Sequence, residues 1–185
     1  MDRRVYKSKK AIMDALIQLM SEKDFETITI NEIADEANVN RGTIYLHYTD
    51  KYDLLNQCIE DHLSKLFKSC LPNGDVSNFP SEAGLLRIFE YLEQHFSFYS
   101  VMLTNKGVPT FRNRLLTMVQ RGLAIKMEKM NESNANGDIN RDVTVQFLAS
   151  AIIGTIEWWL VQSMPYPAKN VVKELYMLID RVWQF

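Results

Sequence analysis

Residues 29–51 read TINEIADEANVNRGTIYLHYTDK, which predicts two short helices joined by a tight turn. Thr29 and Glu32 have the spacing of a capping box, so we expect a helix to begin directly after Thr29. Apolar residues then recur three and four positions apart and form one stripe, made of Ile30, Ile33, Ala34 and Ala37. The first segment is therefore predicted to be an amphipathic helix packed against a neighbour.

The second segment is predicted to be a helix from Arg41 to Tyr48, because Asn40 is a favourable N-cap residue. Ile44 and Tyr48 lie four positions apart, so they share the face that points inward. The other faces carry hydrogen-bond donors and one apolar side chain, without a carboxylate. Such a surface suits the major groove of DNA, where the first residues of a recognition helix contact base edges.

Several residues of this region occur together in a known family. They are Ile30, Ile33, Ala34, Ala37, Val39, the run Gly42-Thr43-Ile44-Tyr45-Leu46-His47-Tyr48, Lys51, Leu54 and Leu55. With them, residues 3–55 resemble the DNA-binding domain of the TetR family of bacterial transcriptional regulators. The resemblance implies an all-α protein, with a three-helix helix-turn-helix domain at residues 1–50 and a helical bundle for effector binding and dimerisation at residues 51–185.

Composition agrees with a helical, folded protein. The chain has 185 residues, of which 46% are hydrophobic, and this is sufficient for a packed core. Seven glycines and five prolines in a chain rich in helix-forming residues favour helices, and we expect about nine of them. The predicted helices beyond residue 50 cover residues 51–71, 82–95, 110–130, 141–164 and 168–183, with an aromatic-rich segment at 96–103 and the clearest linker at 72–81.

The two cysteines and the lack of a leader-like segment indicate a reducing compartment. Cys58 and Cys70 fall on one predicted helix about 18 Å apart at 1.5 Å per residue, too far for a disulfide. Cys58 and His62 have metal-ligand spacing, but without a third ligand nearby they favour core packing, so we expect no metal and no cofactor. No stretch approaches eighteen uncharged apolar residues, and we expect a soluble, cytoplasmic protein that is nucleoid-associated through DNA and has no contact with a membrane.

The formal net charge is −2, but its distribution favours DNA at one end of the chain. The first ten residues hold five cations, namely Arg3, Arg4, Lys7, Lys9 and Lys10, against one aspartate. Such a segment is often a solvated tail, whereas beside a helix-turn-helix it is expected to follow phosphates. DNA binding should then weaken steeply with salt.

The expected DNA contacts come from the basic start and from the second short helix. Arg41 can bond O6 and N7 of guanine or contact a phosphate, and the sequence leaves both open. Gly42 is expected to let the backbone approach the duplex, while Leu46 suits either a thymine methyl or the local core. The resemblance implies phosphate contacts for His47 and Lys51. The full predicted set is Arg3, Arg4, Lys7, Thr29, Asn40, Arg41, Gly42, Thr43, Tyr45, Leu46, His47 and Lys51.

Methionine and aromatic residues are frequent in the second half of the chain. They suit an adaptable pocket for a small lipophilic effector, and they equally suit an ordinary helical core. The resemblance favours the presence of a cavity, because many family members are repressors released by a ligand. The candidate pocket residues are Phe89, Phe96, Tyr99, Met102, Met118, Met127 and Trp159.

The two C-terminal helices are strongly apolar, and the resemblance implies that they pair with the same helices of a second copy. Small residues around Gly154 allow close helix approach, and glycine inside a helix costs about 1 kcal/mol against alanine, which indicates a packing role. The run from Gly154 to Leu160 with the following Met-Pro-Tyr resembles a C-terminal domain subtype common in Firmicutes members. The predicted interface is Phe147, Ala151, Gly154, Trp158, Val161, Leu175, Leu178, Ile179 and Val182. The alternative is a monomeric core that contains Trp158 and Trp159.

The sequence thus favours a homodimeric, sequence-specific DNA-binding regulator, a repressor released from a palindromic double-stranded operator by a small effector. In the alternative interpretation the C-terminal domain binds a protein partner instead of a small ligand. An enzyme is the weakest interpretation: the sequence has no Gly-x-Ser-x-Gly, Cys-x-x-Cys, His-Glu-x-x-His or phosphate-loop motif, and it has three histidines.

Overall fold

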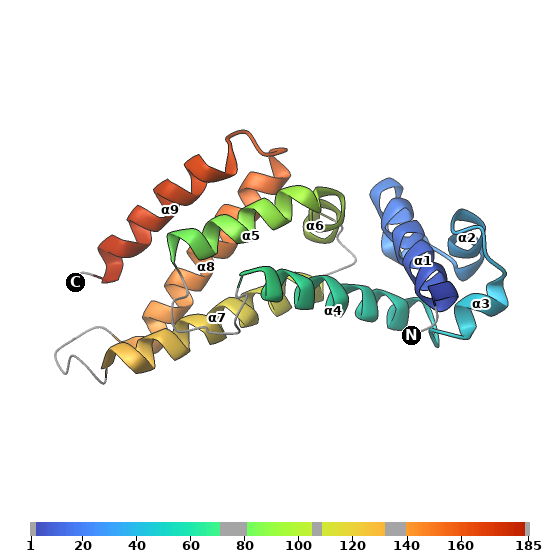
Figure 1. The fold of residues 1–185 in the computed structure, drawn as a ribbon, viewed down its shortest axis with the longest axis horizontal. Helices are drawn as coiled ribbons and strands as arrows, with labels where there is room; N and C mark the ends of the chain where they lie inside the picture. The colour runs from blue at the N-terminus through green and yellow to red at the C-terminus, as the bar shows by residue number, and fades with distance from the viewer. Residues whose placement is uncertain (1–2, 71–80, 105–108, 132–139, 184–185) are drawn as a thin grey trace.

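The computed structural model describes residues 3–70, 81–104, 109–131 and 140–183, and within them it contains nine α-helices, one short 3-10 turn and no strand (Figure 1). The helices are α1 (Arg3–Glu22), α2 (Ile30–Glu36), α3 (Arg41–Tyr45), α4 (Lys51–Cys70), α5 (Glu82–Gln94), α6 (Phe96–Thr104), α7 (Pro109–Asn131), α8 (Arg141–Val161) and α9 (Ala168–Trp183), and the 3-10 turn is η1 (Phe25–Thr27). The all-α prediction is confirmed. Residues 72–80 of the expected linker lie outside the described residues.

Helices α1, α2 and α3 form a small head around buried aliphatic side chains. Ile12, Leu16, Ile33 and Ile44 have no exposed surface. The predicted capping box is present, because Thr29 Oγ1 accepts from the Glu32 amide at 3.3 Å and the Glu32 carboxylate accepts from the Thr29 amide at 2.9 Å. Glu32 also forms an ion pair with Lys23, which fastens the end of α1 to the start of α2.

The turn between α2 and α3 is tight because Asn38 adopts a left-handed conformation, with φ of 51°, which asparagine tolerates better than most residues. Helix α3 is shorter than predicted and ends at Tyr45 rather than Tyr48. The carbonyl of Ile44 accepts from the amides of both His47 and Tyr48 at 2.9 Å, so the last turn tightens. Asp50 then accepts from the amides of Tyr52 and Asp53, each at 2.8 Å, and α4 begins.

Helix α4 runs from the head into the body, which consists of α5 to α9 (Figure 1). In the figure the head lies at one end of the elongated molecule and α9 at the other, and α1 packs against both α4 and α6. Helix α5 packs on α4 and α9, while α7 packs on α8. Arg112 of α7 pairs with Glu157 of α8 at 2.6 Å, and Arg114 of α7 donates to Asn56 of α4 at 3.0 Å. Helix α4 is therefore the element shared by head and body.

Helix α8 is the most apolar long helix of the described part of the chain. By length and composition alone it could cross a membrane, although the sequence was expected to contain no such stretch. Inside the structure 44% of that apolar window is buried, and Ile152, Ile156 and Trp159 belong to the core. A core helix of a folded domain passes the same test of length and composition.

Candidate nucleic-acid interface

The outer surface of α3 and the following turn carries the side chains that the sequence assigned to DNA. Arg41 and Tyr45 are exposed, and Leu46 is 80% exposed. The interpretation of Leu46 as part of the local core is therefore wrong. Thr43 and His47 are half-buried, and the His47 ring meets the Tyr48 ring edge-on at 6.2 Å. Because Ile44 and Tyr48 are buried beneath them, these residues are held on a rigid support.

Arg41 and Tyr45 are joined one helical turn apart. Arg41 Nη2 donates to Tyr45 Oη at 3.2 Å, and the guanidinium lies 5.4 Å from the centre of the Tyr45 ring. A cation at this distance from an aromatic ring is attracted to it, so the guanidinium loses freedom before any ligand arrives. Tyr45 is in this way a positioning residue for Arg41.

Two residues of the predicted DNA-contacting set cap helices. Asn40 Oδ1 accepts from the Gly42 amide at 2.8 Å, and Thr29 caps α2 as described above. A Cβ atom added to Gly42 would lie 3.3 Å from the same Asn40 oxygen, closer than most Cβ contacts. Glycine at position 42 therefore protects the cap of α3 and leaves an exposed stretch of backbone beside Arg41.

Lys51 is placed for a different task from the one that the resemblance implied. Its ammonium group donates to the carbonyls of Phe25, Glu26 and Ile28 at 3.1, 2.7 and 3.0 Å. It also lies 4.9 Å from the centre of the Phe25 ring. An ammonium group has three donors, and all three are taken up by η1 and the residue after it. The geometry favours a structural role, in which Lys51 ties the start of α4 to η1.

Replacing Lys51 with methionine should lower the free energy of unfolding by about 2 kcal/mol, because three carbonyls lose a charged donor. The measurement is urea unfolding of both proteins. If Lys51 instead contacts phosphate, stability will stay unchanged and the salt dependence of DNA binding will become shallower.

Arg3, Arg4 and Lys7 line the exposed start of α1, which has no acidic residue in its first turn. They extend the basic character of the head beyond α3.

The predicted dimer-interface residues divide between the protein surface and the core. Phe147, Trp158, Val161 and Leu178 are 58%, 45%, 49% and 61% exposed. Ala151 and Gly154 lie between them on α8 and are half-buried, whereas the side chain of Val182 lies outside the described ones. Leu175 and Ile179 are buried against the rest of the same chain, so their place in the expected contact face is not supported. The alternative that placed Trp158 in the core is wrong, while Trp159 is fully buried as that alternative had it.

The exposed apolar residues of α8 follow helical spacing over most of its length. Val143 continues the stripe formed by Phe147, Gly154, Trp158 and Val161, and is 63% exposed. Such a contiguous apolar stripe on a surface is typical of a protein-protein contact. Its chemistry fits the same helix of a second copy.

Comparison with known proteins decides the family. The model for bacterial regulatory proteins of the tetR family matches residues 12–58, and the model for a transcriptional regulator C-terminal region matches residues 80–181, more than half of the chain. The chain belongs to the TetR family. The first match covers most of α1 to α3 and the start of α4, so the helix-turn-helix described above is that of a TetR-family transcriptional regulator.

Relatives of this TetR-family chain include curated proteins and solved structures. A TetR transcriptional regulator from Streptococcus agalactiae is 30% identical, with 96% of each chain covered and a TM-score of 0.73. The uncharacterised HTH-type regulator YxbF of Bacillus subtilis is 25% identical over 174 residues, covering 92% of this chain and 44% of that protein. IcaR of Staphylococcus aureus, the negative transcriptional regulator of the biofilm operon icaADBC, is 27% identical over 100 residues, covering 52% of this chain and 54% of IcaR. The chain therefore spans about half the length of the curated relatives it matches.

The residues that the sequence assigned to an effector pocket belong largely to the core of this TetR-family body. Phe89, Tyr99, Met102 and Trp159 are buried, with Phe89 and Trp159 in ring contact at 5.0 Å. Phe96, Met118 and Met127 are half-buried. None of these seven residues lines any of the three cavities described here, so their arrangement favours the core interpretation.

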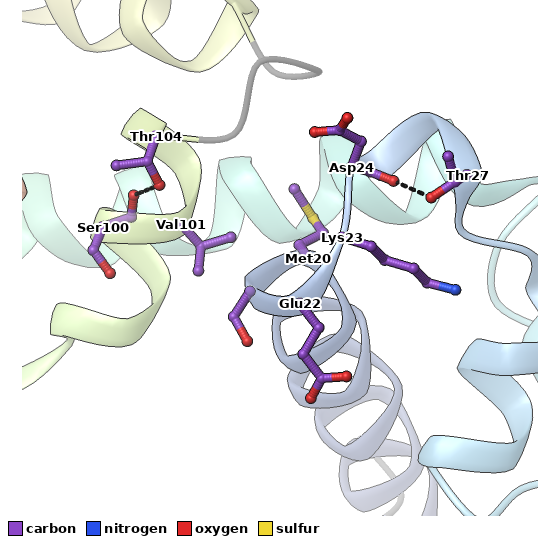
Figure 2. A pocket seen from close by; sticks show the side chains of 9 residues that line it. Met20, Glu22, Lys23, Asp24, Thr27, Ser100, Val101 and Thr104 are labelled. Carbon is purple, nitrogen blue, oxygen red and sulfur yellow. Dashed lines mark hydrogen bonds between the residues drawn. The ribbon is translucent and has the colours of Figure 1, made fainter.

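The three cavities lie elsewhere. An open groove of about 750 Å³ separates the end of α1 from α6. Figure 2 shows Met20 of α1 and Val101 of α6 on its two sides, and both side chains are almost fully buried, whereas most of the other lining residues are polar. A smaller apolar cavity of about 320 Å³ between α8 and α9 is lined by Trp158 and Leu178 on the exposed face. The third, of about 780 Å³, lies among α1, α4 and α6.

Cys58 and His62, which share one side of α4, are packing residues. Burial raises the pKa of the Cys58 thiol to about 12, so the thiol stays protonated and unreactive. The His62 ring stacks on Phe98 at 3.6 Å and meets the His95 and Tyr99 rings edge-on at 6.1 Å. Within the described residues no group of three or more His, Cys, Asp or Glu side chains is arranged to hold a metal ion.

Burial lowers the pKa of His62 from its ordinary 6.5 to about 4; the neighbouring Asp61 opposes this, while Lys65 and His95 add to it. Between these two values the unfolded chain holds more protons than the native one, so stability should fall as pH decreases. For the unchanged protein, the free energy of unfolding should fall by on the order of 1 kcal/mol between pH 7 and pH 5 because of His62, after allowance for solvent screening. Replacing His62 with phenylalanine should remove this fall. Urea unfolding of both proteins at pH 7 and pH 5 measures the effect. The same difference in stability between the two pH values in both proteins would contradict this prediction.

Sequence reasoning missed the role of Lys51 and the cavity around His62. Lys51 contacts carbonyls more than twenty positions away, and no local pattern indicates such contacts. The spacing of Cys58 and His62 drew attention to this side of α4, but it pointed to a metal rather than to Phe98 and His95.

Proposed function

We propose that this TetR-family regulator is a homodimeric, sequence-specific DNA-binding repressor. The observation that carries the proposal is the exposed surface of α3, where Arg41 is held on Tyr45 beside the bare backbone of Gly42. A positioned guanidinium can bond both acceptors of a guanine in the major groove. Leu46, which is exposed and next in line, supplies an apolar contact for a thymine methyl.

The apolar stripe on α8 supports a two-fold dimer. Two recognition helices must reach successive major grooves, about 34 Å apart, to read a palindromic site. Figure 1 shows α9 at the opposite end of the chain from the head, so a contact through α8 and α9 would leave α3 uncovered. Phe147, Trp158 and Val161 would then be removed from water.

Repression and effector control rest on the family. IcaR, an HTH-type protein that is 27% identical over 100 residues, is a negative transcriptional regulator. We propose that this chain likewise binds an operator in the cytoplasm, and that a small molecule bound by the body releases it. For release, the molecule must bind one head-to-body arrangement more tightly than the other.

The test is the salt dependence of binding to duplex DNA, followed by fluorescence anisotropy. Affinity should fall steeply between about 50 and 200 mM salt, as expected for a protein that displaces counterions from several phosphates. Replacing Arg3 or Lys7 with glutamine should reduce the slope by about 0.9 for each phosphate contact removed.

A matched control is Arg121→Gln, at an exposed position of α7 in the body. This change should leave the slope unaltered. Binding that does not respond to salt, or an equal response of all three variants, would contradict the proposed placement of the duplex.

A further inference from the structure

The cavity among α1, α4 and α6 joins the head to the body. It has a volume of about 780 Å³ and is lined by residues of α1, by His62 and neighbours on α4, by His95, which caps the end of α5, and by Phe98 of α6. Helix α1 belongs to the head, whereas α6 belongs to the body, so an occupant would touch both. The volume lies within the range of small-molecule sites, about 300–1,000 Å³.

The walls of this cavity are suited to a flat, partly apolar molecule. Four rings line it, those of Tyr6, His62, His95 and Phe98, together with the apolar side chains of Met13 and Ile17. Aromatic rings attract another ring in offset or edge-on arrangements. Within the described part of the chain, the buried Nδ1 atom of His62 has no hydrogen-bond partner.

The charges around the cavity favour an anion. Three lysines and two aspartates line it. Asp61 is neutralised by Lys65 at 2.6 Å, and Lys10 lies one turn from Asp14 on α1. Lys9 and Lys10 form no ion pair with a carboxylate of the described residues. Lys9 is the half-buried one of the two, and its charge helps to lower the pKa of Asp53 on α4. A carboxylate that reached Lys9 would meet an available ammonium group.

Lys9 also connects this cavity to the recognition helix. Its ammonium lies 5.4 Å from the centre of the Tyr48 ring, and Tyr48 is the buried residue that ends the turn after α3. The hydroxyl of Tyr48 is buried without a partner among the described residues, so this ring is weakly anchored by polar contacts. A carboxylate that draws Lys9 away from the ring removes one contact beneath α3.

We propose that the cavity among α1, α4 and α6 binds a small aromatic carboxylate, whose acid group meets Lys9 and whose ring lies beside His62 and Phe98. This inference rests on the proposed function and assigns the effector site to the junction of head and body rather than to the interior of the body. Binding there favours a different placement of α1 against α6, and the affinity for DNA falls.

The experiment uses the full chain and three probes: benzoate, phenylacetate and 2-naphthoate, titrated by calorimetry at pH 7. At least one acid should bind with a dissociation constant below about 1 mM, which corresponds to roughly −4 kcal/mol. The matching neutral amide and primary amine should bind at least ten-fold more weakly. The proposal would be overturned if the acid, the amide and the amine bind equally well, or if none of the three acids binds.

Variants locate the site. Ser97 is exposed and lines the cavity, so Ser97→Trp should block it and weaken acid binding at least ten-fold. Ser64→Trp is the matched control, because Ser64 is exposed on α4 and does not line the cavity. Lys9→Gln should weaken binding of the acid without altering that of the amide. Acid binding that is unchanged in both Ser97→Trp and Lys9→Gln would place the molecule elsewhere and overturn the assignment.

The same titrations separate this inference from the proposed function. If the acid binds in the cavity but the protein shows no affinity for any duplex, the regulator proposal fails and the site stands. If the protein binds DNA and neither calorimetry nor DNA release responds to the acids, the regulator proposal stands and the effector site fails.

Discussion

Replacing Arg41 with alanine is expected to weaken binding to the preferred operator by at least about 30-fold. A base contact of this kind contributes about 1–3 kcal/mol, and a two-fold site contains two of them. The loss should be accompanied by relaxed specificity at one base pair in each half-site. Quantitative binding to the operator and to its variants at that position measures both effects.

Tyr45→Phe separates the two contacts that hold Arg41. It keeps the ring against the guanidinium and removes the hydroxyl that accepts at 3.2 Å, so an intermediate loss is expected. Arg121→Ala in the body serves as the control for the loss of an exposed cation. If Arg41→Ala weakens all sequences equally and lowers the salt slope, Arg41 contacts phosphate and the assignment to a base is wrong.

Replacing Gly154 with leucine is expected to abolish the dimer without harming the protomer. Within the described part of the chain, a Cβ atom at Gly154 meets no atom within 4 Å, and leucine in a helix is favoured over glycine by about 0.5–1 kcal/mol. The protomer should therefore be at least as stable as before. In a close α8 contact, however, the added side chain stands where the second copy must approach.

Sedimentation at micromolar concentration should then show a monomer, and affinity for a palindromic site should fall by at least about 100-fold, since the second head is no longer delivered together with the first. Ser64→Leu adds the same side chain to an exposed position on α4 and should leave the mass and the affinity unchanged. A Gly154→Leu protein that remains a dimer would exclude α8 as the contact helix.

Local chemistry predicted much of the head. The capping box at Thr29 and Glu32, the N-cap at Asn40 and the inward direction of Ile44 and Tyr48 depend on residues within four positions of one another, and the structure shows them. The end of α3 was placed three residues too late. Apolar spacing continues to Tyr48. The helix ends earlier because the Ile44 carbonyl accepts from the amides of both His47 and Tyr48, and because Asp50 caps the start of the next helix.

The body was harder to predict, because there the same residue types serve cores and pockets. Phe89, Met102 and Trp159 suited either a core or a pocket. They are buried because of the helices that pack around them, and the spacing of apolar residues does not predict which helices pack together. The same limit applies to α9, where Leu175 and Leu178 lie three positions apart on one apolar stripe, yet Leu175 is buried and Leu178 is exposed. Lys51 was predicted to contact a phosphate, whereas its ammonium group donates to three backbone carbonyls that lie far away in the sequence.

Two copies of α3 are proposed to read one symmetric DNA site. Selection of bound sequences from a random duplex pool tests it most directly, with the unchanged protein and Arg41→Ala carried in parallel. We expect enrichment of one two-fold-symmetric sequence with half-sites about one helical turn apart, and loss or broadening of that sequence with Arg41→Ala. A folded dimer that enriches no sequence, or one that enriches the same site with and without Arg41, would contradict it.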